Sequence, residues 1–327
     1  MADKQWKVVY MEAIPQDTAD IIASRLPEGF ELKYLRDYSE EAAREALTWA
    51  DFALVATHPM PAWLIEAAPR LRMIQHQGVG YDRTDVQAAA RCGIPVALCP
   101  EGTTVGVAEH TILLVLAVYK QLVRADRSVR EGEWLQFSLR SGSFEIAGKT
   151  LGLVGLGRIG EAVAKRARAF DARVVYNDIC RRDEGEEQRL GVGYLPLDKL
   201  LAESDIVSLH LPVTPESRHI INAETISKIK PGAILINTSR GALVDESALA
   251  TALESGSLGG AGLDVFETEP PESGNPLLEM GNVILTPHIS AGTKDALIAK
   301  MDAAFANMVR LNEGMQPLHV VQVEEKM

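Results

Sequence analysis

The sequence has few cysteines and no excess of basic over acidic residues, and each of these features excludes a class of protein. The chain of 327 residues has three cysteines, Cys92, Cys99 and Cys180, with no CxxC pair and no cluster of histidine and cysteine. Their spacing predicts neither a disulfide framework nor a metal site, and it favours reduced thiols in a cytoplasmic protein. The formal net charge of -12 argues against nucleic acid as a partner, because no basic excess is present to neutralise phosphates.

Long apolar segments are absent as well. The most apolar run, residues 112–118, is too short to span a bilayer and predicts a buried helix. The opening residues MADKQWKVVYMEA lack the apolar stretch of a signal peptide, so we expect no signal peptide and no membrane partner. With 46% hydrophobic and 24% charged residues and no internal repeat, the chain has the composition of an ordinary globular protein, long enough for two domains.

Short apolar or β-branched runs alternate with helical patterns along almost the whole chain. Strands are predicted over residues 7–10, 31–35, 52–57, 73–77, 95–98, 150–155, 173–178, 205–210, 233–238, 259–266 and 282–286. Helices are predicted over residues 40–50, 104–131 and 293–312, and Asp245 is expected to cap a helix that ends at Gly256. This alternation predicts parallel sheets covered by helices on both faces.

A glycine-rich turn lies between the strand predicted to start at residue 150 and the helix after it. In TLGLVGLGRIG the glycines Gly155, Gly157 and Gly160 form GxGxxG. The first allows a tight turn, the second lets the backbone approach a pyrophosphate, and the third allows close packing of helix on strand. A sharp turn without a ligand is the alternative, but the strand before the turn and the helix after it favour a dinucleotide site.

Asp178 ends the next predicted strand, at the distance expected for a residue that binds ribose hydroxyls. Its carboxylate would repel a 2′-phosphate, which favours NAD over NADP. Arg181 and Arg182 lie just downstream and leave NADP as an alternative, because either could accommodate that phosphate. The simpler interpretation, a solvated loop, is preferred for both.

Three ionisable residues, Arg240, Glu269 and His288, each follow a different strand of the second series. In an open α/β sheet ligands bind at the carboxyl ends of the strands. A guanidinium can hold the carboxylate of a 2-oxo acid, and an imidazole can give a proton to its carbonyl oxygen. A carboxylate beside that imidazole would orient it and favour its protonated form.

Each of these residues has a simpler interpretation when taken alone. His288 could be structural or solvated, Glu269 a loop charge, and Arg240 a helix-start or surface residue. Only their combination behind a dinucleotide motif favours catalysis, and periodicity alone does not show that they converge.

At these residues the sequence resembles the D-isomer-specific 2-hydroxyacid dehydrogenases, from about residue 52 to residue 312. The matching segments are GVGYDRTD (78–85), VAEHTILLVLA (107–117), GLGRIG (155–160), LHLPVTPESRHIIN (209–222), ILINTSRGALVDESAL (234–249), GLDVFETEPP (262–271) and LTPHISAGT (285–293). Several specific motifs in the same order make a chance match implausible.

The resemblance implies that Arg240, Glu269 and His288 form the catalytic set. It maps the substrate loop onto Gly78, Val79 and Gly80, whose N–H groups would hold the substrate carboxylate together with Arg240 and His288. It maps nicotinamide contacts onto Thr104, Thr238 and Asp264, and adenosine contacts onto His210, Leu211 and Pro212. The whole set of cofactor contacts is Thr104, Gly155, Gly157, Arg158, Ile159, Gly160, Asp178, His210, Leu211, Pro212, Thr238, Ser239, Asp264, His288 and Ala291. Asp264 could instead be a strand-terminal hydrogen-bonding residue, while Glu109 and His110 are interpreted simply as helix residues.

The resemblance also implies the fold, which is two doubly wound α/β domains with parallel sheets. A Rossmann NAD-binding domain of residues 103–292 would be inserted into a flavodoxin-like substrate domain of residues 1–102 and 293–327. The crossings near Gly102 and Ala291 would be hinges that close the site to water. The long helix after Thr104, with apolar Val107, Leu113 and Leu116, would form much of a homodimer interface, although burial in the core would give the same pattern.

The implied reaction is hydride transfer between NAD and a small D-2-hydroxy or 2-oxo acid. Formate is disfavoured by Glu269, where formate dehydrogenases carry Gln, and phosphite by Val79, where phosphite dehydrogenases carry Lys. Phosphoglycerate dehydrogenases carry an Arg-Ser pair after the third strand, where this chain reads VATHPMP. His58 in that segment could replace the missing charge, so 3-phosphoglycerate stays an alternative, although an exposed loop histidine is the simpler interpretation. Glyoxylate, hydroxypyruvate or a short aliphatic 2-oxo acid fits better.

A binding protein of the same fold is the alternative from another class. NAD(H)-sensing transcriptional corepressors often keep the catalytic residues, so the catalytic set does not exclude them. This sequence lacks the long disordered extensions that such proteins use, which favours an enzyme.

Overall fold

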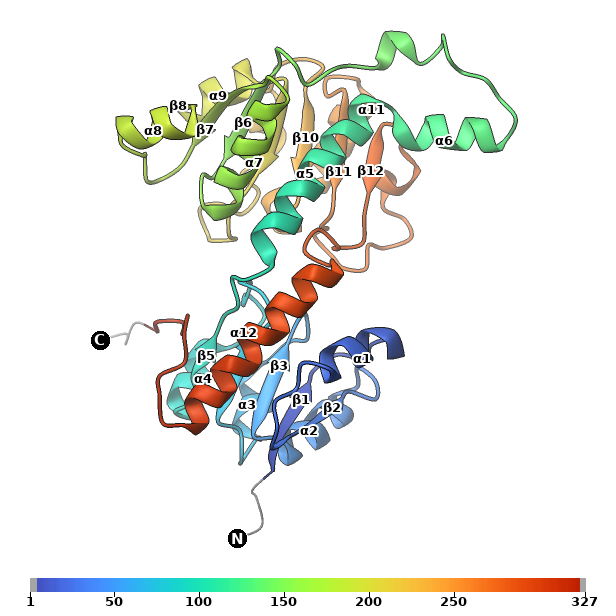
Figure 1. Cartoon of the computed structure of the whole chain (residues 1–327). Coiled ribbons are helices and arrows are strands. Elements are labelled where there is room, and N and C mark those ends of the chain that lie inside the picture. Colours follow the sequence, from blue (N-terminus) through green and yellow to red (C-terminus); the bar gives the residue numbers. More distant parts are fainter. Residues whose placement is uncertain (1–4, 324–327) are drawn as a thin grey trace. The chain divides into compact units, whose positions relative to one another are not determined.

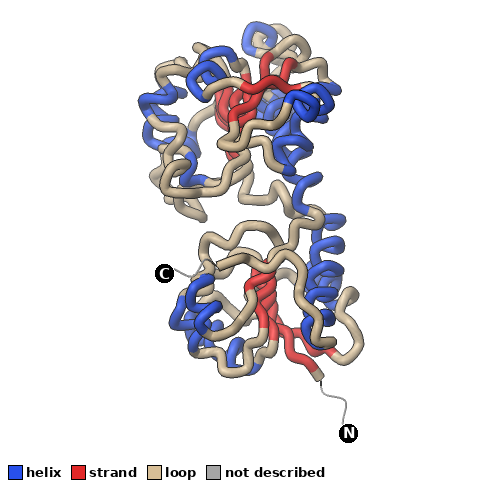
Figure 2. The backbone as a smooth tube through the Cα atoms, turned by 90° about the vertical axis from the view of Figure 1, so that its left-hand side faces the viewer, coloured by secondary structure: helices blue, strands red, loops and turns tan. Residues whose placement is uncertain are grey.

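The structure, a computed structural model that describes residues 5–323, divides into two compact units. One holds the chain up to Thr103 together with the segment from Thr293 onward, and the other holds Thr104–Gly292. The crossings expected from the sequence, at residues 102/103 and 292/293, differ from these by at most one residue. In each unit a layer of strands lies between helices (Figure 2).

The first unit is a five-stranded sheet with parallel strands in the order β2-β1-β3-β4-β5. Its elements, most of which are labelled in Figure 1, are β1 (Trp6–Tyr10), α1 (Gln16–Ala23), β2 (Phe30–Tyr34), α2 (Glu40–Trp49), β3 (Phe52–Val55), α3 (Ala62–Glu66), β4 (Met73–His76), α4 (Val86–Arg91), β5 (Val96–Ala97) and α12 (Lys294–Asn312).

Alternation along the strands sends side chains of the first unit into two core layers. Val9 packs with α2, α3 and α4 on one face of the sheet, whereas Val8 and Tyr10 pack with α1 and α12 on the other. Helix α12 contributes Met301 and Phe305 to this second layer. The last helix of the chain therefore completes a domain begun by the first hundred residues, as the resemblance implied.

The second unit is a seven-stranded parallel sheet in the order β12-β11-β10-β9-β6-β7-β8. Its elements are α5 (Thr103–Tyr119), α6 (Leu122–Arg130), η1 (Arg140–Gly142), β6 (Thr150–Val154), α7 (Arg158–Ala169), β7 (Arg173–Asn177), α8 (Glu184–Leu190), β8 (Val192–Tyr194), α9 (Leu197–Glu203), β9 (Ile206–Leu209), α10 (Ala223–Ile226), β10 (Ile234–Asn237), η2 (Gly241–Leu243), α11 (Glu246–Glu254), β11 (Gly260–Leu263), η3 (Pro276–Glu279) and β12 (Val283–Leu285).

This strand order is that of a Rossmann fold with one further strand. The chain starts at β6, runs outward through β7 and β8, and returns to the other side of β6 at β9, so the switch point lies between β6 and β9. Helices α5 and α7 pack on one face of the sheet, and α9, α10 and α11 pack on the other. The predicted fold class is confirmed.

The prediction of one long helix over residues 104–131 is wrong. Helix α5 ends at Tyr119 and α6 begins at Leu122, with Gln121 in the left-handed region at φ 50° and a bend of 61°. The side chain of Gln121 donates to the carbonyl of Leu139 at 3.0 Å, a tertiary contact that accompanies the break. Among residues 5–323 no single helix is long and apolar enough to cross a membrane; α5 and α6 pass that test only when joined.

Strand β8 was not predicted. It has three residues, follows Gly191 in the left-handed region, and pairs only with the edge of β7. A run this short has no visible alternation, so its extended shape is set by the neighbouring strand.

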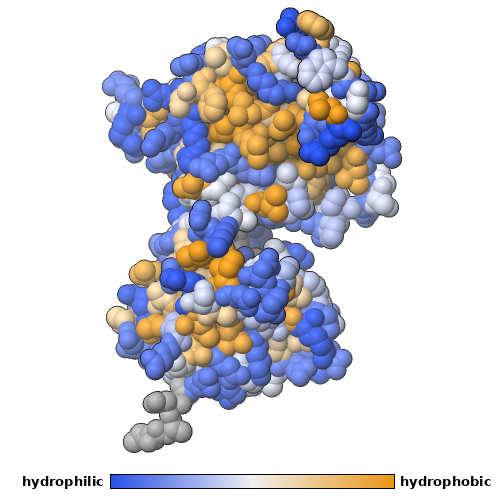
Figure 3. Space-filling view, turned by 45° about the vertical axis from the view of Figure 1, so that its right-hand side comes forward, coloured by the Kyte–Doolittle hydropathy of each residue, from blue (hydrophilic) through white to orange (hydrophobic). Residues whose placement is uncertain are grey.

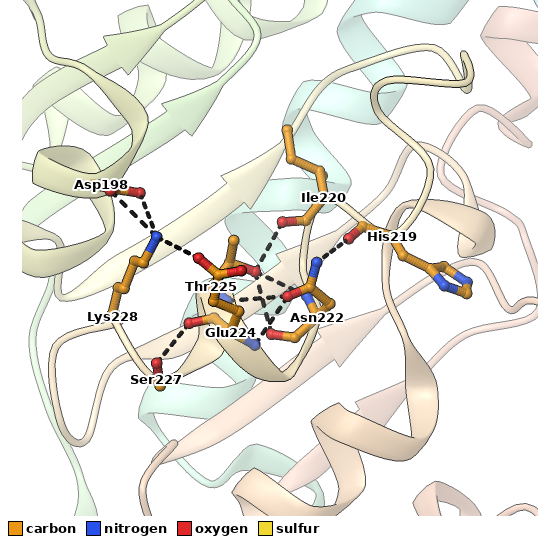
Figure 4. Close-up of polar contacts among 8 residues, drawn as sticks. All are labelled: Asp198, His219, Ile220, Asn222, Glu224, Thr225, Ser227 and Lys228. Atoms are coloured by element: carbon orange, nitrogen blue, oxygen red, sulfur yellow. Dashed lines mark hydrogen bonds and ion pairs between the residues drawn. The ribbon is translucent and has the colours of Figure 1, made fainter.

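Helix ends follow local side-chain chemistry. Asp245 accepts from the N–H of Ala248 and caps α11, and Gly256 has φ +74° just past the end of that helix, both as predicted. Figure 4 shows the start of α10, where Asn222 accepts from the N–H of Thr225 and the hydroxyl of Thr225 accepts from the N–H of Asn222. This capping box gives a four-residue helix a fixed start.

Candidate active site

The predicted acid–base residues lie together at one edge of the second sheet. Glu269 follows β11 and His288 follows β12, and these strands are adjacent and parallel, so their carboxyl ends meet. His288 Nδ1 lies 2.9 Å from Glu269 Oε2. The two side chains are 41% and 35% exposed, which leaves the imidazole within reach of a ligand.

Glu269 is held as a carboxylate. Burial raises its pKa, but the hydrogen bond and charge of His288, the N–H of Phe266 and the charge of Arg240 outweigh burial, so the pKa lies below its ordinary value. An ionised carboxylate only accepts, so Nδ1 of His288 carries the proton in this pair. That arrangement directs the other ring nitrogen, Nε2, to any reaction partner.

Asp264 holds the loop that carries His288. It is fully buried, and its carboxylate accepts from the N–H groups of Ile289 and Ser290, both at 2.9 Å, and from the hydroxyl of Thr286 at 2.6 Å. Its carbonyl accepts from the N–H of His288 at 2.8 Å. This contact fits the strand-terminal interpretation of Asp264, whereas its contact with nicotinamide stays a prediction.

His288 itself is in the left-handed region, with φ 54°. A residue with a Cβ adopts this conformation only where the surroundings fix it, and such residues cluster at functional sites. The contacts of Asp264 with the residues on both sides of His288 supply that constraint.

Helix α5 also contacts the loop that carries His288, and this contact was not predicted from the sequence. His110 Nε2 lies 2.9 Å from the Thr286 hydroxyl and 3.6 Å from Asp264 Oδ1, and Glu109 forms an ion pair with Arg166. His110 is thus more than a plain helix residue, whereas Glu109 is an exposed helix residue, as predicted. The available signal was a run of three polar residues, Glu-His-Thr, inside an otherwise apolar helix.

Arg240 follows β10, the strand next to β11. Its carbonyl accepts from the side chain of Asn237 at 2.8 Å, and its Nη1 donates to the carbonyl of Ser239 at 2.7 Å. Its charge contributes to the lowered pKa of Glu269, so the two side chains are electrostatic neighbours. The structure therefore brings together all three residues that the sequence analysis singled out for catalysis.

The loops after β10 and β11 pack without space between them. A Cβ built on Gly241, the residue after Arg240, would lie 1.9 Å from the carbonyl carbon of Phe266. Phe266 in turn donates its N–H to Glu269. Gly241 was not singled out from the sequence, because only the approach of a second loop makes glycine necessary there.

The glycine-rich turn fits a dinucleotide. Gly155 has φ +100° and passes so close to the carbonyl of His210 that a Cβ would lie 2.4 Å from it, while Gly160 packs against Gly155. Gly157 faces open space, caps α7 and is exposed. The three glycines thus differ as predicted, two serving backbone packing and one leaving room where a phosphate can approach the helix N-terminus.

Two polar residues beside the glycine-rich turn, Asp178 and His210, also suit a dinucleotide. Asp178 accepts from the N–H of Leu156 at 2.7 Å and so stands beside the turn. Nδ1 of His210 is buried without a hydrogen-bond partner at the switch point, while Nε2 contacts the hydroxyl of Ser208 at 2.9 Å. Burial lowers the pKa of His210 to about 4, so its ring is neutral.

The two arginines after Asp178 already have acidic partners. Arg181 is exposed and pairs with Glu187 at 2.9 Å. Arg182 is half-buried, pairs with Glu161 at 2.8 Å and donates to the carbonyl of Leu156. The interpretation as a solvated loop is therefore wrong for Arg182, which supports the glycine-rich turn.

The remaining predicted contacts lie along the carboxyl edge or at the start of α5. Thr238 is buried and contacts Thr111, and Ser239 donates to the carbonyl of Leu209. Of the others, Arg158 and Pro212 are exposed and Thr104, Ile159, Leu211 and Ala291 are half-buried. Their contacts with a cofactor stay predictions.

Val79 and Gly80 belong to the first unit, in the half-buried loop after β4. His58 lies just after β3 of the same unit and is buried, so its simpler interpretation as an exposed loop residue is wrong. Burial also lowers the pKa of His58, which argues against its alternative role as a cation for phosphate.

Comparisons with known proteins agree with this geometry. Residues 112–290 match the family model described as the NAD binding domain of D-isomer specific 2-hydroxyacid dehydrogenase. The chain is 42% identical over 308 residues to a glyoxylate reductase of Korarchaeum cryptofilum, covering 92% of both chains. It is 37% identical over 318 residues to a D-3-phosphoglycerate dehydrogenase of Archaeoglobus fulgidus, covering 97% of this chain and 59% of that protein.

A solved structure is similar over the same length. An acyclic imino acid reductase in complex with NADPH and D-Arg superposes with a TM-score of 0.83 at 30% identity, covering 97% of this chain and 100% of that one.

Proposed function

Because this chain belongs to the D-isomer-specific 2-hydroxyacid dehydrogenases, we propose that it uses Arg240, Glu269 and His288 to reduce glyoxylate or hydroxypyruvate. The observation that carries the proposal is the 2.9 Å pair of His288 Nδ1 and Glu269 Oε2, with the charge of Arg240 beside it. The cation of Arg240, the proton donor His288 and the carboxylate that orients its ring thus lie at one edge of the sheet.

Each residue has a separate part in the proposed reaction. The nicotinamide, when bound, supplies the hydride. Arg240 binds the substrate carboxylate with its planar guanidinium, and His288 gives a proton from Nε2 to the carbonyl oxygen. Glu269 holds the ring at Nδ1 and stabilises its protonated form before that transfer.

Two observations support a small, uncharged substituent on the substrate. Several relatives with about 40% identity are named glyoxylate reductase. The segment VATHPMP has no arginine, and its His58 is buried, which lowers the pKa of the ring. The alternative substrate, 3-phosphoglycerate, has the support of the D-3-phosphoglycerate dehydrogenase relatives.

NAD is the proposed cofactor. Asp178 supports it, because a carboxylate beside the turn repels a 2′-phosphate. Arg181 and Arg182 already pair with Glu187 and Glu161, so their charge is partly neutralised. The NADPH complex of the imino acid reductase keeps NADP as the alternative.

The test of this function is a panel of 2-oxo acids assayed with NADH and with NADPH, for the wild type and His288→Ala. We expect the highest kcat/KM for glyoxylate or hydroxypyruvate with NADH, and a loss of about 10²- to 10⁴-fold in kcat for the variant. Thermal unfolding of the variant checks that it folds. Activity with no acid, or undiminished activity in the variant, would overturn the proposed catalytic roles.

We also propose that the protein is a cytoplasmic homodimer. Side chains exposed on α5, α6 and the segment after them support a covered face: Val105, Leu113, Val123, Trp134 and Phe137 are 49–77% exposed. Figure 3 shows a broad apolar area on the second unit. Isolated large apolar side chains are ordinary, but a group of this size is typical of an interface.

We expect light scattering to give twice the chain mass for the wild type. Trp134→Asp combined with Phe137→Asp should give a monomer, because two charged groups would have to be buried in the interface. Leu278→Asp, at an apolar position of the same unit that is 40% exposed, is the control and should stay dimeric. A monomeric wild type would contradict the proposal.

A further inference from the structure

The first unit has a switch point of its own. Its strand order β2-β1-β3-β4-β5 means that the chain leaves β1 on one side and returns on the other, so β1 and β3 are neighbours whose connections run in opposite directions. Ligands of open α/β sheets bind at the carboxyl ends of strands at such a point. Glu12 comes just after β1, and Thr57 and His58 come just after β3.

Glu12 is a carboxylate buried at that point, with 4% of its surface exposed. It accepts from the N–H groups of Thr57 and His58 and from the hydroxyls of Thr57 and Tyr38, the last at 3.3 Å. All these donors are neutral. They bind the carboxylate oxygens but do not cancel the negative charge, which stays at the edge of the sheet.

His58 adds a second unusual group. Its side chain is buried and stacks on Tyr38 with 6.2 Å between ring centroids, and its Nδ1 is buried without a hydrogen-bond partner. Arg83 brings a positive charge to this corner; it is exposed and donates to the carbonyl of Thr57 at 3.3 Å. The buried positions thus combine one carboxylate with an imidazole ring.

This corner adjoins the loop predicted to hold the substrate carboxylate. Strand β4 is the neighbour of β3, and the N–H of Gln77 donates to the carbonyl of Val55 at 2.9 Å. The hydroxyl of Tyr10, at the end of β1, donates to the side chain of Gln77 at 2.8 Å. Gly78, Val79 and Gly80 follow directly, so a substrate held by this loop has Glu12 and His58 at the same edge of the same sheet.

We propose that Glu12, Thr57 and His58 form the element that selects the substituent of the 2-oxo acid, admitting an uncharged one and excluding an anionic one. The inference rests on the proposed function and assigns to these residues its preference for glyoxylate and hydroxypyruvate, whose substituents are uncharged, over a phosphorylated acid. A phosphorylated substituent would bring negative charge toward a buried carboxylate that has no basic partner among its hydrogen-bond donors.

The experiment compares hydroxypyruvate with 3-phosphohydroxypyruvate, which differ only in the phosphate. For the wild type we expect kcat/KM to be at least about a hundredfold higher for hydroxypyruvate. In Glu12→Gln, which removes the charge and keeps the shape, this ratio should fall at least about tenfold, mainly because KM for the phosphorylated acid falls. Glu66→Gln is the matched control, because it removes an exposed carboxylate of the same unit, and its ratio should equal that of the wild type.

A second measurement needs no variant and covers the case in which Glu12→Gln does not fold. Inhibition of the wild type by D-glycerate should be at least about tenfold stronger than inhibition by 3-phospho-D-glycerate. Equal inhibition, equal kcat/KM for the two acids, or an unchanged ratio in folded Glu12→Gln overturns the inference while leaving the proposed function intact. A wild type that reduces no 2-oxo acid overturns the proposed function and, with it, this inference.

Discussion

At the residue scale, Arg240 depends on geometry as well as charge. Its backbone carbonyl is fixed by Asn237 and one of its nitrogens is fixed on the carbonyl of Ser239. A guanidinium has five N–H groups in one plane, in a fork that suits the two oxygens of a carboxylate. An ammonium group has the charge but not this planar fork.

Arg240→Lys should therefore raise KM for the 2-oxo acid by about 10- to 100-fold with a smaller change in kcat, because substrate binding loses a bidentate contact. Steady-state kinetics with saturating NADH measures both constants. Arg173→Lys, at a surface arginine of the same unit paired with Glu203, is the control and should match the wild type. An unchanged KM in Arg240→Lys would count against the proposed role.

At the element scale, two turns after strands position the catalytic and cofactor-binding groups, and the glycines in these turns differ in the space around them. Gly241 follows β10 in a space that the backbone of Phe266 already fills, whereas Gly157 follows β6 and faces open space. A methyl group at Gly241 has to displace the loop that carries Glu269, but at Gly157 it meets no protein atom within 4 Å.

This difference in space predicts that one alanine variant loses folding stability and the other loses affinity for NADH. Gly241→Ala should lower the free energy of unfolding by about 1–3 kcal/mol and reduce kcat, because overpacking separates Arg240 from Glu269. Gly157→Ala should leave that free energy within about 0.5 kcal/mol of the wild type and weaken NADH binding at least about tenfold, because the methyl group occupies the space next to the helix N-terminus.

Urea unfolding and fluorescence titration with NADH measure the two effects separately. Gly193→Ala on β8, another glycine with no atom within 4 Å, is the control and should change neither quantity. Normal NADH affinity in Gly157→Ala would show that the turn does not hold the pyrophosphate.

At the scale of the whole molecule, both units contain a histidine that folding keeps neutral. Burial lowers the pKa of His76 in the first unit, and that of His210 in the second, to about 4. The unfolded chain has a histidine pKa of about 6.5. The neutral ring therefore stabilises each fold fully above pH 6.5, and this contribution is lost as the pH falls toward 4.

We expect the free energy of unfolding of the first unit to fall by on the order of 3 kcal/mol between pH 6.5 and pH 4 because of His76, which is 3% exposed. His76→Gln should flatten this dependence, since glutamine does not titrate. Urea unfolding can be followed by tryptophan fluorescence, because Trp6, Trp49 and Trp63 lie in this unit. His319→Gln removes an exposed histidine of the same unit and should keep the slope of the wild type.

The strands, the glycine motif and the catalytic candidates could be predicted from the sequence because each has a local cause. Alternating apolar residues make the strands of both sheets, and GxGxxG makes the turn at Gly155. Arg240, Glu269 and His288 could be singled out because parallel strands end at one edge, so three polar residues after three strands are brought near each other whatever the side-chain details.

Other features had no local cause and were missed or misjudged. The break at Gln121 lies in an apolar pattern that continues past it, and the close approach of Gly241 to Phe266 joins residues 25 apart in the sequence. His110 contacts Thr286, 176 residues away, and Glu12 contacts His58, 46 residues away. The sequence by itself determined the order of the elements, the dinucleotide turn and the identity of the chemical groups, because these depend on neighbouring residues. Only the tertiary structure decided which groups are buried, which pairs form hydrogen bonds and where a methyl group has room, because burial and contact depend on segments distant in the sequence.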